Sequence, residues 1–146
     1  MNIRRTTHLL LTAIPRAIHR HGYGIQSPWA YQLVRDVLFE PLPYYAYQEQ
    51  HLTTPMQQQL FRLRNHYRHQ PLVIIHEKGQ AAMQHYQQLL PTITQDTILI
   101  IEHINDQNYP LWETILSHPH TTVTFDMGHR GMATFHPKRI KQNYLL

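Results

Sequence analysis

The chain contains no cysteine, little charge and few glycines. Without cysteine it cannot hold a disulfide scaffold, a Cys-ligated zinc or iron–sulfur site, or a thiol nucleophile. Charged residues make up 15% of the chain, against roughly a quarter in an ordinary soluble domain. No apolar run approaches the about 20 residues that a membrane-spanning helix needs, and no secretory signal is recognisable. We therefore expect a cytoplasmic protein with no membrane segment.

Histidine supplies much of the polar character. The 146 residues include 13 histidines and 13 Lys+Arg, with a formal charge of +4 when histidine is neutral. Hydrophobic residues reach 42%, which excludes a disordered tail. The length suits one compact domain with a buried core.

Helical signals fill the first 70 residues. Apolar spacing predicts a helix over residues 3–20, kinked or started at Pro15. Ser27 can cap a second helix that begins at Pro28 and extends to about residue 39. An aromatic loop over 43–47 precedes a third helix, which Thr54 and Pro55 open.

Strand signals dominate the remainder. Residues 72–75 and 97–101 form apolar β-branched runs typical of strands covered on both faces. Helices are expected over 80–90 and from Pro110, and alternation over 121–125 and 132–135 predicts an antiparallel hairpin. The fold class is therefore α/β: N-terminal helices (1–70), then a small mixed sheet of about four strands (71–146), in one compact domain.

Two segments of the N-terminal third carry a recognisable pattern: the string from His21 to Tyr31 (HGYGIQSPWAY) and the segment from Pro43 to Tyr47 (PYYAY). They resemble the N-terminal extension of a Bacteroidetes family of class I SAM-dependent methyltransferases. Residues 60–67 resemble the helix that enters its catalytic domain, and residues 96–104 resemble the end of one of its strands. Residues 118–126, with Gly131 and Met132, resemble its last hairpin. The resemblance implies a truncated Rossmann-like fold with strand order 72–76, 97–102, 131–136, 121–126, and with 131–136 antiparallel.

The cofactor half of that family has no counterpart in this chain. None of the five glycines lies in a strand–GxG–helix context, where glycine lets the backbone approach the ligand closely. The chain instead passes from Gln70 directly into strand 72–75, which resembles the family's fourth strand. We therefore expect no SAM binding by the isolated chain, no activity as an isolated enzyme, and a role as a binding or assembly protein. The alternative is a methyltransferase subunit whose SAM site is completed by a partner or a second copy.

Three residues at predicted strand ends form a weak candidate metal site. His76 follows the first strand, and Glu102 and His103 follow the second. Parallel neighbouring strands place their carboxyl ends side by side, and two imidazoles with one carboxylate suit zinc, iron or nickel. The competing interpretation is a set of solvated groups in a histidine-rich chain.

A basic N-terminal segment with nearby aromatic residues suggests a second alternative, a small nucleic-acid-binding module. Phosphate contacts and base stacking would use both kinds of side chain. The basic residues are Arg4, Arg5, His8, Arg16, His19, Arg20 and His21, and the aromatic residues are Tyr23, Trp29, Tyr44, Tyr45 and Tyr47. The competing interpretation is a solvated helix face beside an aromatic core. Surface positions are expected for His66, His69 and His85, and a solvated basic end for Lys138, Arg139 and Lys141.

The apolar strand expected at residues 72–76 indicates that the protein pairs with another protein chain. The family's corresponding strand is bonded on both sides, so loss of the cofactor half would leave one edge bare and apolar. Exposed apolar edges invite another strand. We expect a homodimer, or another protein partner, through this edge.

Overall fold

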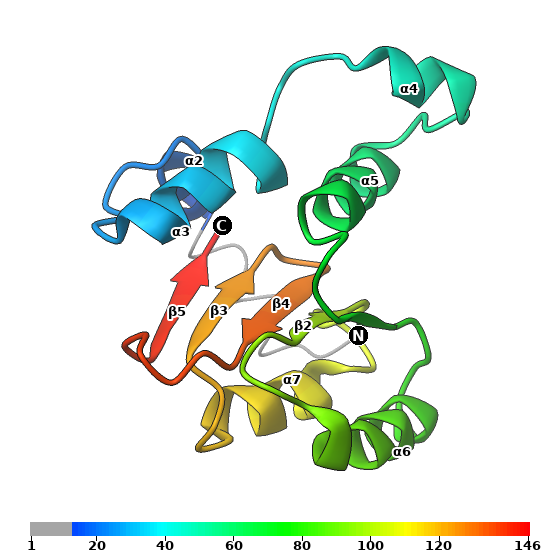
Figure 1. Cartoon of the computed structure of the whole chain (residues 1–146), viewed down its shortest axis with the longest axis vertical. Helices are drawn as coiled ribbons and strands as arrows, with labels where there is room; N and C mark the ends of the chain where they lie inside the picture. Colours follow the sequence, from blue (N-terminus) through cyan, green and yellow to red (C-terminus); the bar gives the residue numbers. More distant parts are fainter. Residues whose placement is uncertain (1–12) are drawn as a thin grey trace.

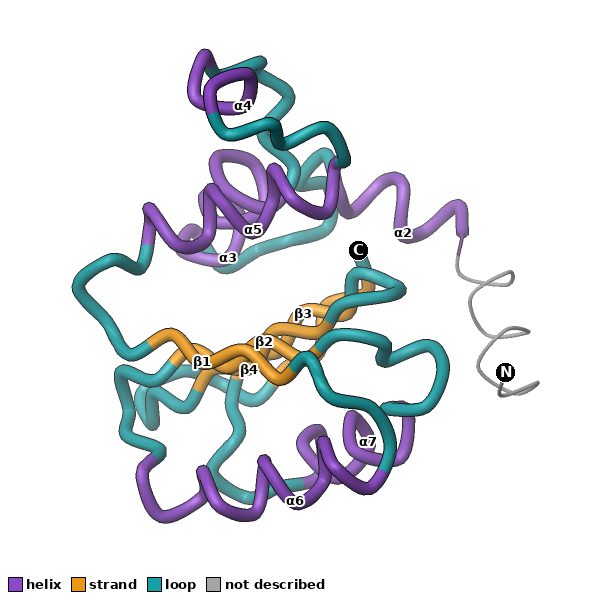
Figure 2. The backbone as a smooth tube through the Cα atoms, turned by 90° about the vertical axis from the view of Figure 1, so that its right-hand side faces the viewer, coloured by secondary structure: helices purple, strands orange, loops and turns teal. Residues whose placement is uncertain are grey.

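The computed structural model describes residues 13–146. Helices α2, α3, α4 and α5 lie on one side of a five-stranded sheet, and α6 and α7 lie on the other (Figure 2). The predicted α/β class is therefore confirmed as a three-layer arrangement. No helix in the described part of the chain has the length and apolar character needed to cross a membrane.

The helices begin where the sequence supplies caps. Ser27 accepts a hydrogen bond from the amide of Ala30 at the start of α3, and Thr54 and Gln57 form a reciprocal capping box at the start of α5. The elements are α2 (Ala13–Arg20), α3 (Pro28–Leu33), the π-helical turn η1 (Val34–Leu38), α4 (Tyr45–Glu49), α5 (Pro55–His66), α6 (Gln80–Leu89), the 3₁₀ turn η2 (Leu90–Thr92) and α7 (Tyr109–Ser117).

The sheet has the order β1-β2-β4-β3-β5. Its strands are β1 (Leu72–Ile75), β2 (Ile98–Ile101), β3 (Val123–Asp126), β4 (Gly131–Thr134) and β5 (Gln142–Leu145). β1 and β2 are parallel, and β4 is antiparallel to β2. β4 is also antiparallel to β3, and β5 runs parallel to β3 (Figure 1). The order and direction expected for the first four strands are confirmed.

Two sequence-based expectations need correction. The sheet has five strands rather than about four, because the polar segment Gln142–Leu145 pairs with β3 at the sheet edge. The segment predicted as an aromatic loop contains α4, which starts at Tyr45 and includes the buried Tyr47. Both elements are short, and their pairing or burial depends on residues distant in sequence.

The two faces of the sheet bury two apolar clusters. Ile98 and Ile100 of β2 pack with the N-terminal helices, in the cluster that contains Leu33 and Leu63. The alternate residues of the strand pack with α6 and α7 around the fully buried Trp112. Because strand side chains alternate between faces, a continuous apolar run serves both layers.

A buried ion pair connects α2 to the ends of the strands near the β5 edge of the sheet. The guanidinium of Arg16 donates to the Asp126 carboxylate at 3.1 Å and to the carbonyl of Leu146 at 3.0 Å. The side chains are 5% and 1% exposed. Arg16 therefore attaches the N-terminal helix to the ends of β3 and β5, instead of lying on a basic surface as expected.

Candidate functional site

The carboxyl ends of β1 and β2 hold the three predicted metal candidates, but the structure gives each a separate environment. His76 is exposed, and Glu102 is buried against Arg130. His103 forms a turn with φ of 60°, where its carbonyl accepts the amides of Asp106 and Asn108. Within residues 13–146, no group of three or more His, Asp or Glu side chains is placed to hold a metal ion.

Asn108 fills the crevice between these two strand ends. Its amide nitrogen donates to the carbonyls of Glu77 and Glu102, both at 2.8 Å, and its Oδ1 accepts the amide of Gly79 at 2.8 Å. Asn108 is fully buried. Open α/β sheets bind ligands in the crevice at this end of the strands. Here an asparagine of the chain itself joins the loops that would form such a site.

A buried polar network lies beside Asn108. Nε of Arg130 donates to Oε1 of Glu102 at 2.7 Å, and its Nη1 donates to the carbonyl of Met56 and to Oε1 of Gln59, both at 3.0 Å. Gln59 in turn donates to the carbonyl of Leu38 at 2.9 Å. The network connects the end of β2, the β3–β4 turn and α5, and each of its buried charges depends on the other for a partner. No sequence motif predicts this network, because Glu102 and Arg130 lie 28 positions apart.

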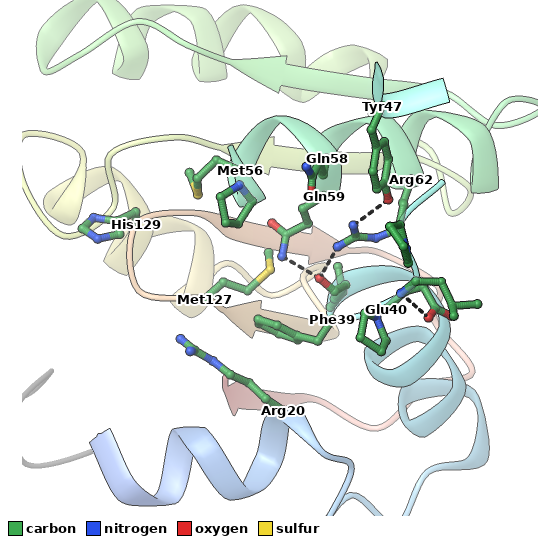
Figure 3. Close-up of a pocket in the computed structure, with 15 residues that line it drawn as sticks. Arg20, Phe39, Glu40, Tyr47, Met56, Gln58, Gln59, Arg62, Met127 and His129 are labelled. Carbon is green, nitrogen blue, oxygen red and sulfur yellow. Dashed lines mark hydrogen bonds between the residues drawn. The ribbon is translucent and has the colours of Figure 1, made fainter. Parts of the chain in front are cut away.

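The helical layer and the β3–β4 turn enclose a pocket of about 450 Å³ (Figure 3). Apolar side chains such as Phe39, Met56 and Met127 line much of it. Arg20 lies over the Phe39 ring at 5.0 Å and donates to the carbonyl of Leu146 at 3.4 Å. Its guanidinium thus holds the loop and the chain end together.

The second arginine of this pocket, Arg62, also forms hydrogen bonds with groups of the chain itself. Arg62 donates to the carbonyls of Val37 and Leu38. It also donates to the Tyr47 hydroxyl (Figure 3). These contacts satisfy carbonyls at the end of η1, which the helix itself leaves without partners. Both arginines of this pocket therefore bind groups of the protein itself, which indicates a structural role for them.

Folding separates the residues of the predicted nucleic-acid surface into a buried group and an exposed group. Trp29 lies beneath the Arg139 guanidinium and against Phe125, and Tyr47 is buried. Tyr23 and Tyr45 remain 69% and 73% exposed. Still exposed with them are Arg20, His21 and Tyr44. His19 is half-buried, and its Nδ1–H donates to the carbonyl of Leu145 at 2.9 Å. Arg4, Arg5 and His8 lie outside the described residues.

The edge strand β1 has one unpaired side. The amides of Ile98 in β2 and of Glu102 just after it donate to the carbonyls of Pro71 and Ile75. Because backbone polar groups of successive strand residues point to opposite edges, those of Leu72 and Ile74 point away from β2. In the described part of the chain, only β2 pairs with β1. The side chains of β1 nearest this edge are half-buried and uncharged.

Comparison of the chain with protein-family models, with curated proteins and with solved structures finds no match. The likeness to class I methyltransferases therefore remains an expectation from sequence.

Proposed function

We propose that the chain is an assembly protein that pairs with a second copy of itself through β1, and that it does not bind SAM on its own. The observation that carries this proposal is the open side of β1, where Leu72 and Ile74 present backbone donors and acceptors. An unpaired edge of this kind is a template for another strand.

The open edge has little of the protection that natural sheet edges carry. Charges, prolines and bulges usually prevent edge-to-edge pairing. Pro71 gives no such protection, because its carbonyl faces β2 and its missing amide lies on that same side. Glu77 and Lys78 come only after the strand has ended.

A twofold dimer would give hydrogen-bond partners to the backbone groups on the open side of β1. If β1 pairs antiparallel with its copy about Ile74, the two Ile74 residues exchange hydrogen bonds, and Leu72 lies opposite His76 of the second copy. Val73 and Ile75 then face each other across the pair, on the face that packs against α6 and α7. Such a contact is self-complementary and closes as a dimer, the commonest symmetry of homo-oligomers.

The crevice at the strand ends supports a non-enzymatic role. Asn108 and the Arg130–Glu102 pair occupy it with hydrogen bonds inside the chain. SAM binding in the resembling family uses a glycine-rich turn. Gly79, at the turn after β1, gives its amide to Asn108 instead of presenting it to a ligand.

Sedimentation equilibrium of three proteins tests the proposal. The unmodified chain should form a dimer, and Ile74→Lys should give a folded monomer because it places a charge at the twofold axis. Gln142→Lys is the matched control: it adds the same charge to β5, at the opposite edge, and should leave the dimer intact.

A chain that stays monomeric at high micromolar concentration would refute the assembly role. Calorimetric titration with SAM examines the other half of the proposal. Saturable SAM binding by the dimer would instead favour a methyltransferase site completed by the second copy.

A further inference from the structure

A second pocket, of about 260 Å³, opens at the other end of the parallel strands. It lies where α5 ends and where β1 and β2 begin, beside the loop between β4 and β5. Its lining carries the side chains of one arginine, one tyrosine and several histidines: His66, Tyr67, His69, His136 and Arg139. The sequence predicts only solvated positions for His66, His69 and Arg139.

Arg139 is held in place without any polar partner. Its guanidinium lies 3.7 Å from the centroid of the Trp29 ring. Across residues 13–146, that guanidinium makes neither a hydrogen bond nor an ion pair. Stacking on an aromatic face orients a guanidinium while leaving its N–H groups available for an oxyanion. Partial burial lowers the pKa of Arg139, but the group stays protonated.

Tyr67 also lines this pocket, but its hydroxyl is buried and has no surface open to a ligand. The residue is 6% exposed, and the hydroxyl has no hydrogen-bond partner within the described structure. Burial raises the pKa of Tyr67, and the phenol therefore keeps its proton. Tyr67 thus belongs to the pocket wall as a neutral side chain, and Arg139 supplies the positive charge.

The histidines add donors around the same space. Nδ1 of His136 accepts the amide of Lys138 at 3.3 Å, which leaves Nε2 to carry the ring proton. His66 packs edge-on against the Tyr67 ring at 4.6 Å. Asp96 is the one carboxylate on the pocket wall, and it forms no ion pair with Arg139 among the described residues.

We propose that this pocket binds an oxyanion, either inorganic phosphate or the phosphate group of a small monoester. Arg139 gives charge-assisted hydrogen bonds, and the histidine N–H groups complete the set of donors. This site is independent of the β1 edge, which uses other residues.

Titration with inorganic phosphate, followed by calorimetry and by tryptophan emission, tests the proposal on the full chain. Saturable binding should change the emission of Trp29, because the ligand draws on the guanidinium stacked against it. Arg139→Gln should weaken phosphate binding about tenfold or more. Lys138→Gln removes the same charge from the neighbouring, exposed position and should change the affinity by less than about twofold.

A further variant distinguishes a ligand site from a structural cluster. Asp96→Asn should strengthen binding by removing a repelling charge.

The source of the phosphate is decided by a parallel titration with glycerol phosphate. Tighter binding of this ester would assign an organic phosphate, and equal or weaker binding would assign inorganic phosphate. Absence of saturable phosphate and ester binding, or equal losses in Arg139→Gln and Lys138→Gln, would overturn the proposal.

Discussion

Replacing Arg130 by methionine should destabilise the protein by about 3–5 kcal/mol, because the change leaves the Glu102 carboxylate buried without its partner. The two side chains are only 4% and 11% exposed, and their atoms lie 2.7 Å apart. The substitution also removes the donor to the carbonyl of Met56 and to Gln59. A single domain has a total stability of roughly 5–15 kcal/mol, so this loss is a large fraction of it.

Urea denaturation with linear extrapolation measures the effect. The double variant Arg130→Met with Glu102→Leu should recover most of the loss, since a buried ion pair replaced by apolar residues is often close to neutral. Arg68→Met is the control at an exposed arginine and should change the unfolding free energy by no more than about 0.5 kcal/mol.

The reasoning fails under either of two results. A loss below about 1 kcal/mol for Arg130→Met would mean that water reaches Glu102 and solvates it. A double variant no more stable than the single one would mean that the loss comes from packing or from the contacts to α5, and not from an unpaired charge.

Two other predictions concern packing and protonation. Gly131→Ala should cost about 1–3 kcal/mol in urea denaturation, because an added Cβ would lie 2.6 Å from the fully buried Trp112 ring; an unchanged midpoint would contradict this packing. Burial, together with His120 and Lys141, lowers the pKa of His118 below 6.5, so the native state binds fewer protons than the unfolded state and stability should fall as the pH drops through about 6.5. Histidine NMR titration checks this, and a midpoint at or above 6.5 would contradict it.

Local signals in the sequence located most of the described elements. Ser27 and Thr54 mark helix starts because a capping side chain bonds to amides two or three residues away. The apolar runs at β1 and β2 indicate strands covered on both faces, and the two alternating segments indicate a hairpin. These features depend on neighbours within a few positions, so they can be predicted without the tertiary structure.

Other features depend on contacts between distant segments. β5 is a polar segment that becomes a strand only because the edge of β3 is available to it. The supposed basic surface around Arg16 is a buried ion pair with Asp126, 110 positions away. The charge and composition of such a segment are the same whether it is buried or exposed, so the sequence does not show which of the two applies.

The candidate sites divide in the same way. The run 72–75 by itself determined an apolar strand, and with the loss of neighbouring strands it predicted an open edge. The tertiary structure alone decided that Pro71 faces β2, that Asn108 closes the strand-end crevice, and that Arg139 rests on Trp29 beside an unpartnered Tyr67 hydroxyl. The physical reason is that hydrogen-bond satisfaction and desolvation depend on which groups meet in space, whereas the sequence fixes only the order in which they occur along the chain.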